Sequence, residues 1–224
     1  MENVVITGTS CGMGFAAAKK FLQSGEEVHG IDILPCPQEL LASYPNSYHH
    51  HLCNVADADS LPDIDDVTIL VNNAGVQGSG RDIEINLQGI INTTEKYALN
   101  NSKIRSVLNQ ASASAHLGTD FGEYVASKGG VLAYTKWTAK SIAKYGATCN
   151  SLSFGGVITE SNKPVIYNHE LWAQVMDLTP LSKWCSVEEA AEWIYFFTVI
   201  NKSCSGQDLI IDNLESLNGT FVWE

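Results

Sequence analysis

A tyrosine and a lysine four positions apart, Tyr124 and Lys128, are the pair in this sequence best suited to proton transfer. Side chains at positions i and i+4 share one face of a helix, so a helix here would bring the two groups together. A phenol has a pKa of about 10, but a nearby ammonium stabilises the phenolate and lowers that pKa. The same spacing is also typical of an ordinary solvated helix face, so the pair alone does not identify a site.

Two serines precede this pair. Ser112 and Ser114 follow an apolar stretch that predicts a strand, and parallel sheets place their ligands where strands end. A hydroxyl there could hold a substrate oxygen and stabilise the charge that develops on it. An earlier predicted strand ends in the small residues of segment 72–75, which would let a ligand lie against the backbone.

A glycine-rich turn follows the first apolar segment and leads directly into a predicted helix. Glycines at positions 8, 12 and 14 allow a tight turn and a close approach of the backbone to a pyrophosphate. The amino end of the helix offers free N–H groups and a positive dipole end to phosphates. A glycine-rich loop without a ligand is the alternative, but the strand before and the helix after the turn favour nucleotide binding.

An acidic residue ends the second predicted strand. Asp32 lies 18 residues beyond Gly14, where a carboxylate can bind the hydroxyls of an adenosine ribose. A carboxylate repels a 2′-phosphate, and neither segment 33–37 nor Cys11 supplies a basic side chain for one. We therefore predict NAD in preference to NADP, the alternative being an exposed acid at a strand end.

Short apolar runs alternate along the chain with helical patterns, which is typical of a parallel sheet covered on both faces. Strands are expected at 4–7, 27–32, 48–53, 67–72, 103–112, 147–153 and 208–212, and helices at 14–24, 87–100, 124–145 and 187–200. The predicted fold class is α/β, a doubly wound parallel sheet of the Rossmann type with about seven strands, in a single domain over 1–224.

Composition excludes several classes of partner. The 224 residues carry 13 Lys and Arg against 25 Asp and Glu, and a net charge of −12 disfavours nucleic acids and anionic membranes. The six cysteines form no CxxC pair, which indicates reduced thiols and not a disulfide framework or a zinc site. The chain opens without a basic signal region, and its longest apolar run, 193–200, is too short to span a bilayer, so we expect a cytoplasmic protein.

Together these patterns resemble the short-chain dehydrogenase/reductase family in its short, single-domain form, from residue 4 to about 213. Further segments that match are Cys53-Asn54-Val55, Asn72-Asn73-Ala74-Gly75, Asn86-Leu87-Gln88-Gly89, Gly156-Val157-Ile158-Thr159 and 206–212. The resemblance implies that the cofactor is bound by Gly8, Ser10, Cys11, Gly12, Met13, Gly14, Asp32, Ile33, Asn54, Val55, Asn73, Ala74, Gly75, Tyr124, Lys128, Val157 and Thr159.

The resemblance also implies a mechanism. Tyr124 would be the general acid/base, and Lys128 would lower its pKa and hold the nicotinamide ribose. Ser112, preferred over Ser114 by its spacing to Tyr124, would polarise the carbonyl, and Asn86 would hold a water in a proton relay. The expected enzyme is an NAD-dependent oxidoreductase that interconverts a secondary alcohol and a ketone, with the cofactor carrying the hydride. Substrate contacts are expected from Ser114, His116, Tyr167 and Trp172.

Two other functions compete with this one. A catalytically silent dinucleotide-binding sensor or scaffold would have the same fold, but it would have no need for the four catalytic positions. A sugar-nucleotide epimerase would need an added C-terminal domain, for which the chain leaves no room. The resemblance further implies a small-molecule substrate and a homodimer or homotetramer. Aromatic residues at 193, 195, 196 and 197 would belong to subunit contacts or to the core.

Several positions depart from the family pattern. Segments 56–66 and 76–85 are shortened, and the latter is too short for a full helix, which would leave a thinner or more open wall. Asn54 stands where Asp is usual, Phe154 where Pro is usual, and Asn213 and Leu214 follow Asp212 in place of two glycines. These departures bear on substrate handling more than on cofactor binding.

A run of three histidines, 49 to 51, lies close to Cys53. On a strand His49 and His51 face one way and His50 the other, so three ligands cannot converge from this run alone. We therefore expect no metal site from it.

Overall fold

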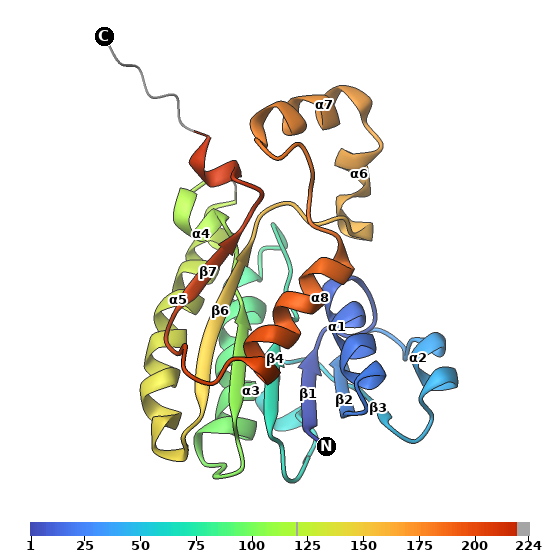
Figure 1. Cartoon of the computed structure of the whole chain (residues 1–224), viewed down its shortest axis with the longest axis vertical. Helices are drawn as coiled ribbons and strands as arrows, with labels where there is room; N and C mark the ends of the chain where they lie inside the picture. The colour runs from blue at the N-terminus through green and yellow to red at the C-terminus, as the bar shows by residue number, and fades with distance from the viewer. Residues whose placement is uncertain (120, 219–224) are drawn as a thin grey trace.

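The computed structural model describes residues 1–119 and 121–218. Its centre is a seven-stranded, all-parallel sheet with the strand order β3-β2-β1-β4-β5-β6-β7. Helices lie on both faces of this sheet (Figure 1), which confirms the predicted Rossmann-type α/β fold. The strands are β1 (Asn3–Thr7), β2 (Glu27–Asp32), β3 (Tyr48–Leu52), β4 (Ile69–Asn72), β5 (Ser106–Gln110), β6 (Thr148–Phe154) and β7 (Asp208–Ile211).

Most of the longer helices agree with the sequence pattern, whereas one of them and the short helices were not predicted. The longer ones are α1 (Gly12–Gln23), α5 (Gly122–Ile142), α7 (His169–Leu178) and α8 (Val187–Tyr195), the last continued by η6 (Phe196–Ile200). A continuous helical segment joins η2 (Ile83–Gln88), α3 (Gly89–Thr94) and η3 (Glu95–Leu99). The unpredicted helices are α7 and the single-turn or two-turn α2 (Gln38–Ser43), α4 (Ser114–Leu117) and α6 (Lys163–Ile166). In Figure 1, α6 and α7 stand apart above the sheet.

Alternation along the strands divides the core into two layers. Val4 and Ile6 of β1 point into a layer that includes Phe21 of α1 and Ile194 of α8. Val5, between them, points into the opposite layer. A strand buried on both faces must be apolar at successive positions, which is why these strands read as continuous apolar runs.

A buried polar network ties two strands to two helices. The Asn72 amide donates to Asn109 Oδ1 at 2.9 Å and accepts from Thr93 Oγ1 at 2.7 Å. The Asn109 amide donates in turn to Thr135 Oγ1 of α5 at 2.9 Å. All four side chains are buried, and buried polar groups contribute to stability only when they are hydrogen-bonded. The network therefore fixes the position of α3 and α5 on the sheet.

The turn after β7 has a conformation that favours glycine, although Asn213 and Leu214 stand at these positions. Asn213 and Leu214 adopt φ values of 55° and 71°, in the left-handed region that favours glycine. The Asp212 carboxylate accepts from the amides of Leu214 and Ser216 at 3.0 and 2.7 Å. These two bonds offset the strain of the non-glycine residues. At the neighbouring departure, Phe154 is buried in the core.

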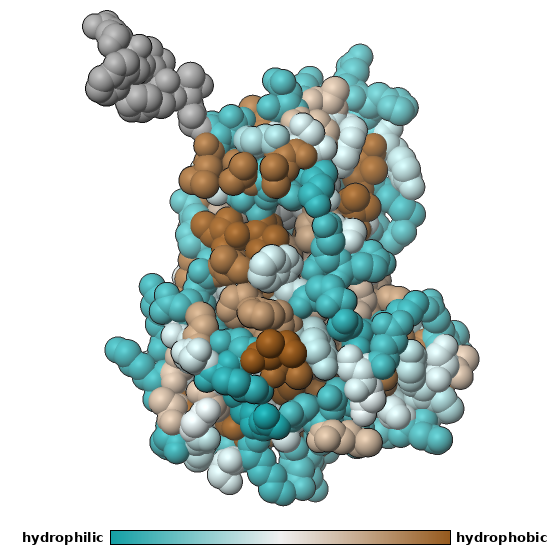
Figure 2. Space-filling model, viewed as in Figure 1, coloured by the Kyte–Doolittle hydropathy of each residue, from teal (hydrophilic) through white to brown (hydrophobic). Residues whose placement is uncertain are grey.

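The aromatic residues at the end of α8 are divided between core and surface. Phe197 is buried, whereas Trp193 and Phe196 are exposed. Figure 2 shows brown hydrophobic patches between hydrophilic ones on the face that α8 crosses. None of the helices that the structure describes is long and apolar enough to cross a membrane.

Replacing Asn109 with leucine should lower the free energy of unfolding by about 1–3 kcal/mol, because Asn72 and Thr135 would each lose a buried partner. Urea denaturation of this variant and of Asn100→Leu, at an exposed position, measures the difference. The control should change stability by less than about 0.5 kcal/mol. Equal stability of the two variants would show that the network does not hold the helices.

Candidate active site

The four candidate catalytic side chains come from three elements at the carboxyl ends of the strands. Ser112 follows β5, Asn86 lies in η2, and Tyr124 and Lys128 lie on the first turns of α5. The Lys128 ammonium lies 5.7 Å from the centre of the Tyr124 ring. The predicted pairing of these two side chains on one helix face is therefore present in the structure.

Lys128 is a buried cation, with only 3% of its surface exposed. Its Nζ donates to the carbonyl oxygen of Gln110, the last residue of β5, at 2.8 Å. Burial lowers the pKa of Lys128 to about 8, and the charge of Asp82 opposes this shift. At neutral pH the group is still largely an ammonium, so it places a positive charge next to the phenol of Tyr124.

Asn86 joins the loop after β4 to α5. Its amide nitrogen donates to the Val76 carbonyl at 2.8 Å and to Ser127 Oγ at 3.1 Å, and its oxygen accepts from the Val76 amide at 2.8 Å. A Cβ atom added to Gly75 would lie 3.0 Å from this oxygen and 3.5 Å from Lys128 Nζ. The Asn86 oxygen and the Lys128 ammonium therefore flank the same glycine.

Asp82 is a functional candidate that the sequence reasoning missed. Its buried carboxylate accepts from the amides of Gly78 and Ser79 at 2.8 and 2.9 Å. These bonds fold the short loop so tightly that the helix begins at Ile83, whereas the sequence predicted Leu87. An acid directly before a helix and after a glycine-rich stretch is typical of a helix start, and that signal was available in the sequence.

The two serines after β5 lie in different surroundings. Ser112 is buried and its Oγ accepts from the amide of Ser114 at 3.2 Å, whereas Ser114 begins α4 and is half-buried. The turn of α4 carries His116 to the edge of the sheet. Its imidazole bonds Asp208 of β7 at 2.8 Å and Ser153 at 3.3 Å. His116 is thus held by the sheet edge and is not directed at Ser112 by any contact of the described residues.

The glycine turn packs directly on the segment that follows β4. Gly8 and Gly12 have φ values of 77° and 58°, and a Cβ at Gly14 would collide with the carbonyl of Gly8. The Asn73 amide donates to the carbonyl oxygen of Thr7 at 3.0 Å. Gly8 and Gly12 must be glycines because of their positive φ values, and Gly14 because a side chain has no space there. The turn therefore has the bare backbone that a close approach to a pyrophosphate requires.

Asp32, the last residue of β2, holds the glycine turn and the residues that follow the strand. Its two oxygens accept from the amides of Ser10 and Leu34 at 2.8 and 2.9 Å. A carboxylate has about four acceptor positions, so these bonds leave capacity for ribose hydroxyls. Next to it, Ile33 is exposed at the surface.

The segment after β3 is held against α3. Asn54 accepts from the Ala56 amide at 3.0 Å, and the carbonyl of buried Val55 accepts from the Asn92 amide group at 2.9 Å. A Cβ at Gly89 would collide with Val55. Asparagine at position 54 therefore makes a local turn bond, which an aspartate would also make.

A wall beside the segment that follows β6 contains a second residue that the sequence reasoning missed. Trp184 packs flat against Gly156, where any Cβ would collide with its indole, and its Nε1 is buried without a partner among the described residues. Trp172 of α7 meets the Trp184 ring edge-on at 5.1 Å. Trp172 thus belongs to this wall. Trp184 was missed because it lies twelve positions further along the chain, at a spacing that matches no helical or strand pattern.

Tyr167 lies elsewhere. Its side chain is 71% exposed and lines a groove of about 640 Å³ between α1, α6 and α8. Gly12 and Thr159 border this groove, but the four candidate catalytic residues do not. Val157 is buried and pairs with Cys185. The structure therefore brings Thr159 to the glycine turn but does not bring Tyr167 to Ser112.

Replacing Asp82 with asparagine should accelerate hydrogen exchange at the amides of Gly78 and Ser79 by at least about tenfold, because a neutral amide is a weaker acceptor than a carboxylate. Mass spectrometry after deuterium labelling measures this rate. Glu84→Gln is the matched control, because among the described residues that exposed carboxylate bonds Arg81 and not the loop. Unchanged exchange rates at Gly78 and Ser79 in the Asp82 variant would show that the carboxylate does not hold the loop.

Comparison with known proteins shows the family to which the chain is similar. Residues 8–213 match the family model described as enoyl-(acyl carrier protein) reductase. The chain is 26% identical over 214 residues to the 5-keto-D-gluconate 5-reductase of Escherichia coli strain K12, with 84% of each chain covered. It is 28% identical over 238 aligned positions to the 3-oxoacyl-(acyl-carrier-protein) reductase of Chlamydia pneumoniae, covering 94% of this chain and 95% of that one.

Solved structures share the fold. A protein from Agrobacterium tumefaciens described as a 2-deoxy-D-gluconate 3-dehydrogenase, with bound NADP, has a TM-score of 0.87, 24% identity and 96% coverage of both chains. A 4-hydroxyisoleucine dehydrogenase complexed with NADH has a TM-score of 0.87 and 22% identity, covering 95% of this chain and 98% of that one. With the family match over most of its length, the chain belongs to the short-chain dehydrogenase/reductase family of oxidoreductases, in its short single-domain form.

Proposed function

We propose that this protein is an NAD-dependent oxidoreductase that interconverts a secondary alcohol and a ketone, with Tyr124 as the general acid/base. The observation that carries the proposal is the buried ammonium of Lys128, 5.7 Å from the Tyr124 ring at the carboxyl end of β5. Burying a charge is costly, and a fold gains little from this one unless the charge acts on a neighbouring group.

The residues around the glycine turn fit a dinucleotide. The amino end of the twelve-residue α1 has no side-chain cap at Cys11, so the first amides of the helix are available to a pyrophosphate. Gly8, Gly12 and Gly14 leave the backbone bare there, and Thr159 lies beside Gly12. When bound, the nicotinamide supplies the hydride acceptor or donor. The relatives are named as reductases of 5-keto-D-gluconate and of 3-oxoacyl-(acyl-carrier-protein), which supports a carbonyl substrate.

The protein's own residues supply the proton chemistry. The Lys128 ammonium favours the phenolate of Tyr124, so the phenol can take a proton from an alcohol and return it to a ketone oxygen. Ser112 would donate a hydrogen bond to the same oxygen, where negative charge develops. The Asn86 oxygen already accepts from Val76 and has a second acceptor position, through which it would hold a water beside Lys128.

The preference for NAD rests on Asp32. Its carboxylate lies at the end of β2 with 8% of its surface exposed, and segment 33–37 carries no basic side chain. A 2′-phosphate at this position would meet a negative charge without a compensating cation, whereas ribose hydroxyls would find an acceptor. Proteins of the same fold bind either cofactor, so the local charge is the deciding feature.

Replacing Tyr124 with phenylalanine should lower turnover by about 10²–10⁴-fold, because the proton would lose its acceptor, while the affinity for NADH stays within a few-fold. A panel of secondary alcohols and ketones, followed by NADH absorbance, measures turnover. Tyr134→Phe, on the same helix, is the matched control and should retain activity. A Tyr124 variant with most of its activity would refute the acid/base role, and a native protein that binds NADH but turns over no member of the panel would favour a silent sensor.

Replacing Asp32 with asparagine should reduce the ratio of NAD to NADP affinity by at least about tenfold, equivalent to about 1.4 kcal/mol. The loss of one negative charge removes repulsion of the 2′-phosphate and weakens the acceptor for the ribose. Titration calorimetry with both cofactors measures the ratio, with Asp59→Asn as a control at an exposed acid. An unchanged ratio would show that Asp32 does not select the cofactor.

A further inference from the structure

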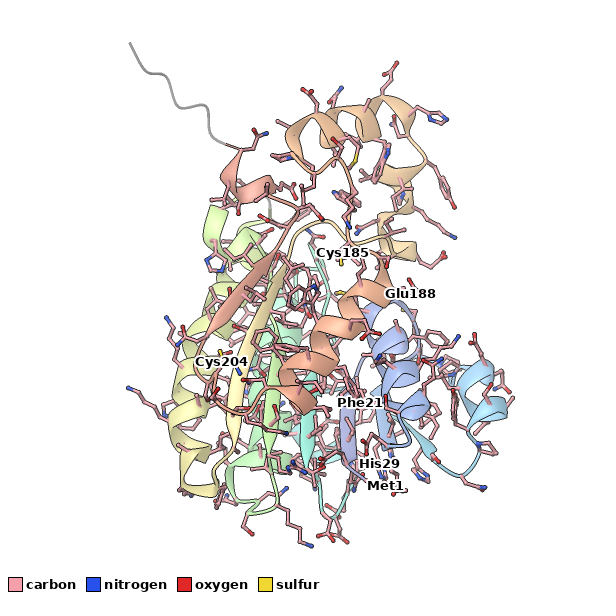
Figure 3. All side chains as sticks on the ribbon, viewed as in Figure 1. Met1, Phe21, His29, Cys185, Glu188 and Cys204 are labelled. Carbon is pink, nitrogen blue, oxygen red and sulfur yellow. The ribbon has the colours of Figure 1, made fainter. Side chains whose placement is uncertain are left out.

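A cluster of imidazoles lies on β2 and β3, at a distance from the proposed active site. His29 of β2 pairs in register with His49 of the edge strand β3, and Glu27 is the first residue of β2. Because parallel strands place register partners on the same face, His29, His49 and Glu27 lie together with His51, two positions along β3. Figure 3 shows His29 near Met1, at the opposite end of the strands from the glycine turn.

Three ligand atoms converge in this cluster. Glu27 Oε1 lies 2.9 Å from His49 Nε2 and 4.0 Å from His29 Nε2, and the ligand atoms of the three residues lie within 4.8 Å of one another. Ligands of a tetrahedral zinc ion at bond lengths of about 2.0–2.2 Å lie roughly 3.3 Å apart. Small side-chain movements would therefore bring this group to coordination distance. Within the described residues, no other group of three metal-ligating side chains comes this close.

His51 contacts His29 and so belongs to the same cluster. Its Nε2 lies 3.1 Å from His29 Nδ1, on the side of the ring away from Glu27. If His29 donates this hydrogen bond, its Nε2 keeps a free lone pair directed at Glu27 and His49. A second partner that fixes the tautomer of a ligating histidine is the usual support of a metal site.

The surroundings suit a metal ion better than a purely structural ion pair. A neutral imidazole offers a ring nitrogen lone pair, as a metal ligand must. The connection from β3 to β4 contains only the three-residue η1 (Ala58–Ser60), so no helix of this connection covers the cluster. Glu27 and His49 are 41% and 39% exposed, which leaves a path for an ion from solvent.

We propose that Glu27, His29 and His49 bind one divalent transition-metal ion of the zinc class, with His51 supporting His29 and water in the remaining position. Two imidazoles and a carboxylate with an open position are a common ligand set for zinc. The three ligands come from two adjacent strands, so the ion would fasten the edge strand β3 to β2. The site lies at the amino end of the strands, separate from the proposed hydride transfer.

The histidine run alone did not predict this site, because the second imidazole and the carboxylate come from the preceding strand. His50 confirms the alternation that the run implies. Its ring bonds the hydroxyl of Tyr48 and the carbonyl of Leu34, on the other face of the sheet. His50 is therefore a matched control, being an imidazole in the same run that is turned away from the cluster.

The test is zinc binding by full-length, tag-free, folded protein, stripped with a chelator and with its accessible cysteines alkylated. Competition with a chromophoric chelator should give one zinc ion per chain for the native protein and for His50→Ala. Glu27→Gln and His49→Ala, at half-exposed positions that leave the core intact, should weaken binding by at least about tenfold, and His51→Ala by about 10–100-fold. The absorbance of bound cobalt should report a tetrahedral site in the native protein and in His50→Ala, and this signal should be lost in Glu27→Gln and His49→Ala.

A thermal measurement without chelator provides a second criterion. Zinc should raise the melting temperature of the native protein and of His50→Ala, because an ion that binds only the folded state stabilises it, and it should not raise that of His49→Ala. The proposal is overturned if native protein fails to bind zinc, or if Glu27→Gln and His49→Ala bind it as tightly as His50→Ala does.

Discussion

The buried ammonium of Lys128 is the constraint around which the proposed site is arranged. An isolated charge in the interior is costly, so the fold must surround it with acceptors and opposite charge. The Gln110 carbonyl at the end of β5 accepts a hydrogen bond from the ammonium, and the buried carboxylate of Asp82 favours the charged form of Lys128. Burial still lowers its pKa to about 8, which keeps the group close to its titration point and charged at neutral pH. The ring of Tyr124 lies over this charge.

Meeting that constraint requires three elements to come together. The sheet must place the end of β5 below α5, the loop after β4 must be short enough to bring Asp82 near, and Asn86 must join that loop to α5. The buried network through Asn72 and Asn109 fixes α3 and α5 on the same two strands. The contraction of segment 76–85 is thus compatible with the site, because two side chains pin the loop in place of a longer helix.

The sequence predicted the features that depend on local pattern. The alternation of apolar runs with helical patterns was sufficient to place the strands and most of the long helices along the chain. An i, i+4 spacing was sufficient to pair Tyr124 with Lys128. Features that depend on packing between distant segments were missed. Trp184 is recognisable only once its indole is seen against Gly156. Asp82 was missed for another reason, because the helix-start signal that it carries was present in the sequence but was not used. The histidine run was judged on one strand, although its partners lie on the neighbouring one.

The central claim, that the Lys128 ammonium and the Tyr124 phenol act together beside a nicotinamide, is tested most directly by a crystal structure with bound NADH. We predict that Lys128 Nζ lies within hydrogen-bond distance, about 2.6–3.2 Å, of a hydroxyl of the nicotinamide ribose, with the Tyr124 oxygen facing the reactive carbon of the ring. A dinucleotide that leaves Lys128 without a contact, or that binds with the Tyr124 oxygen turned away from the ring, would contradict the claim.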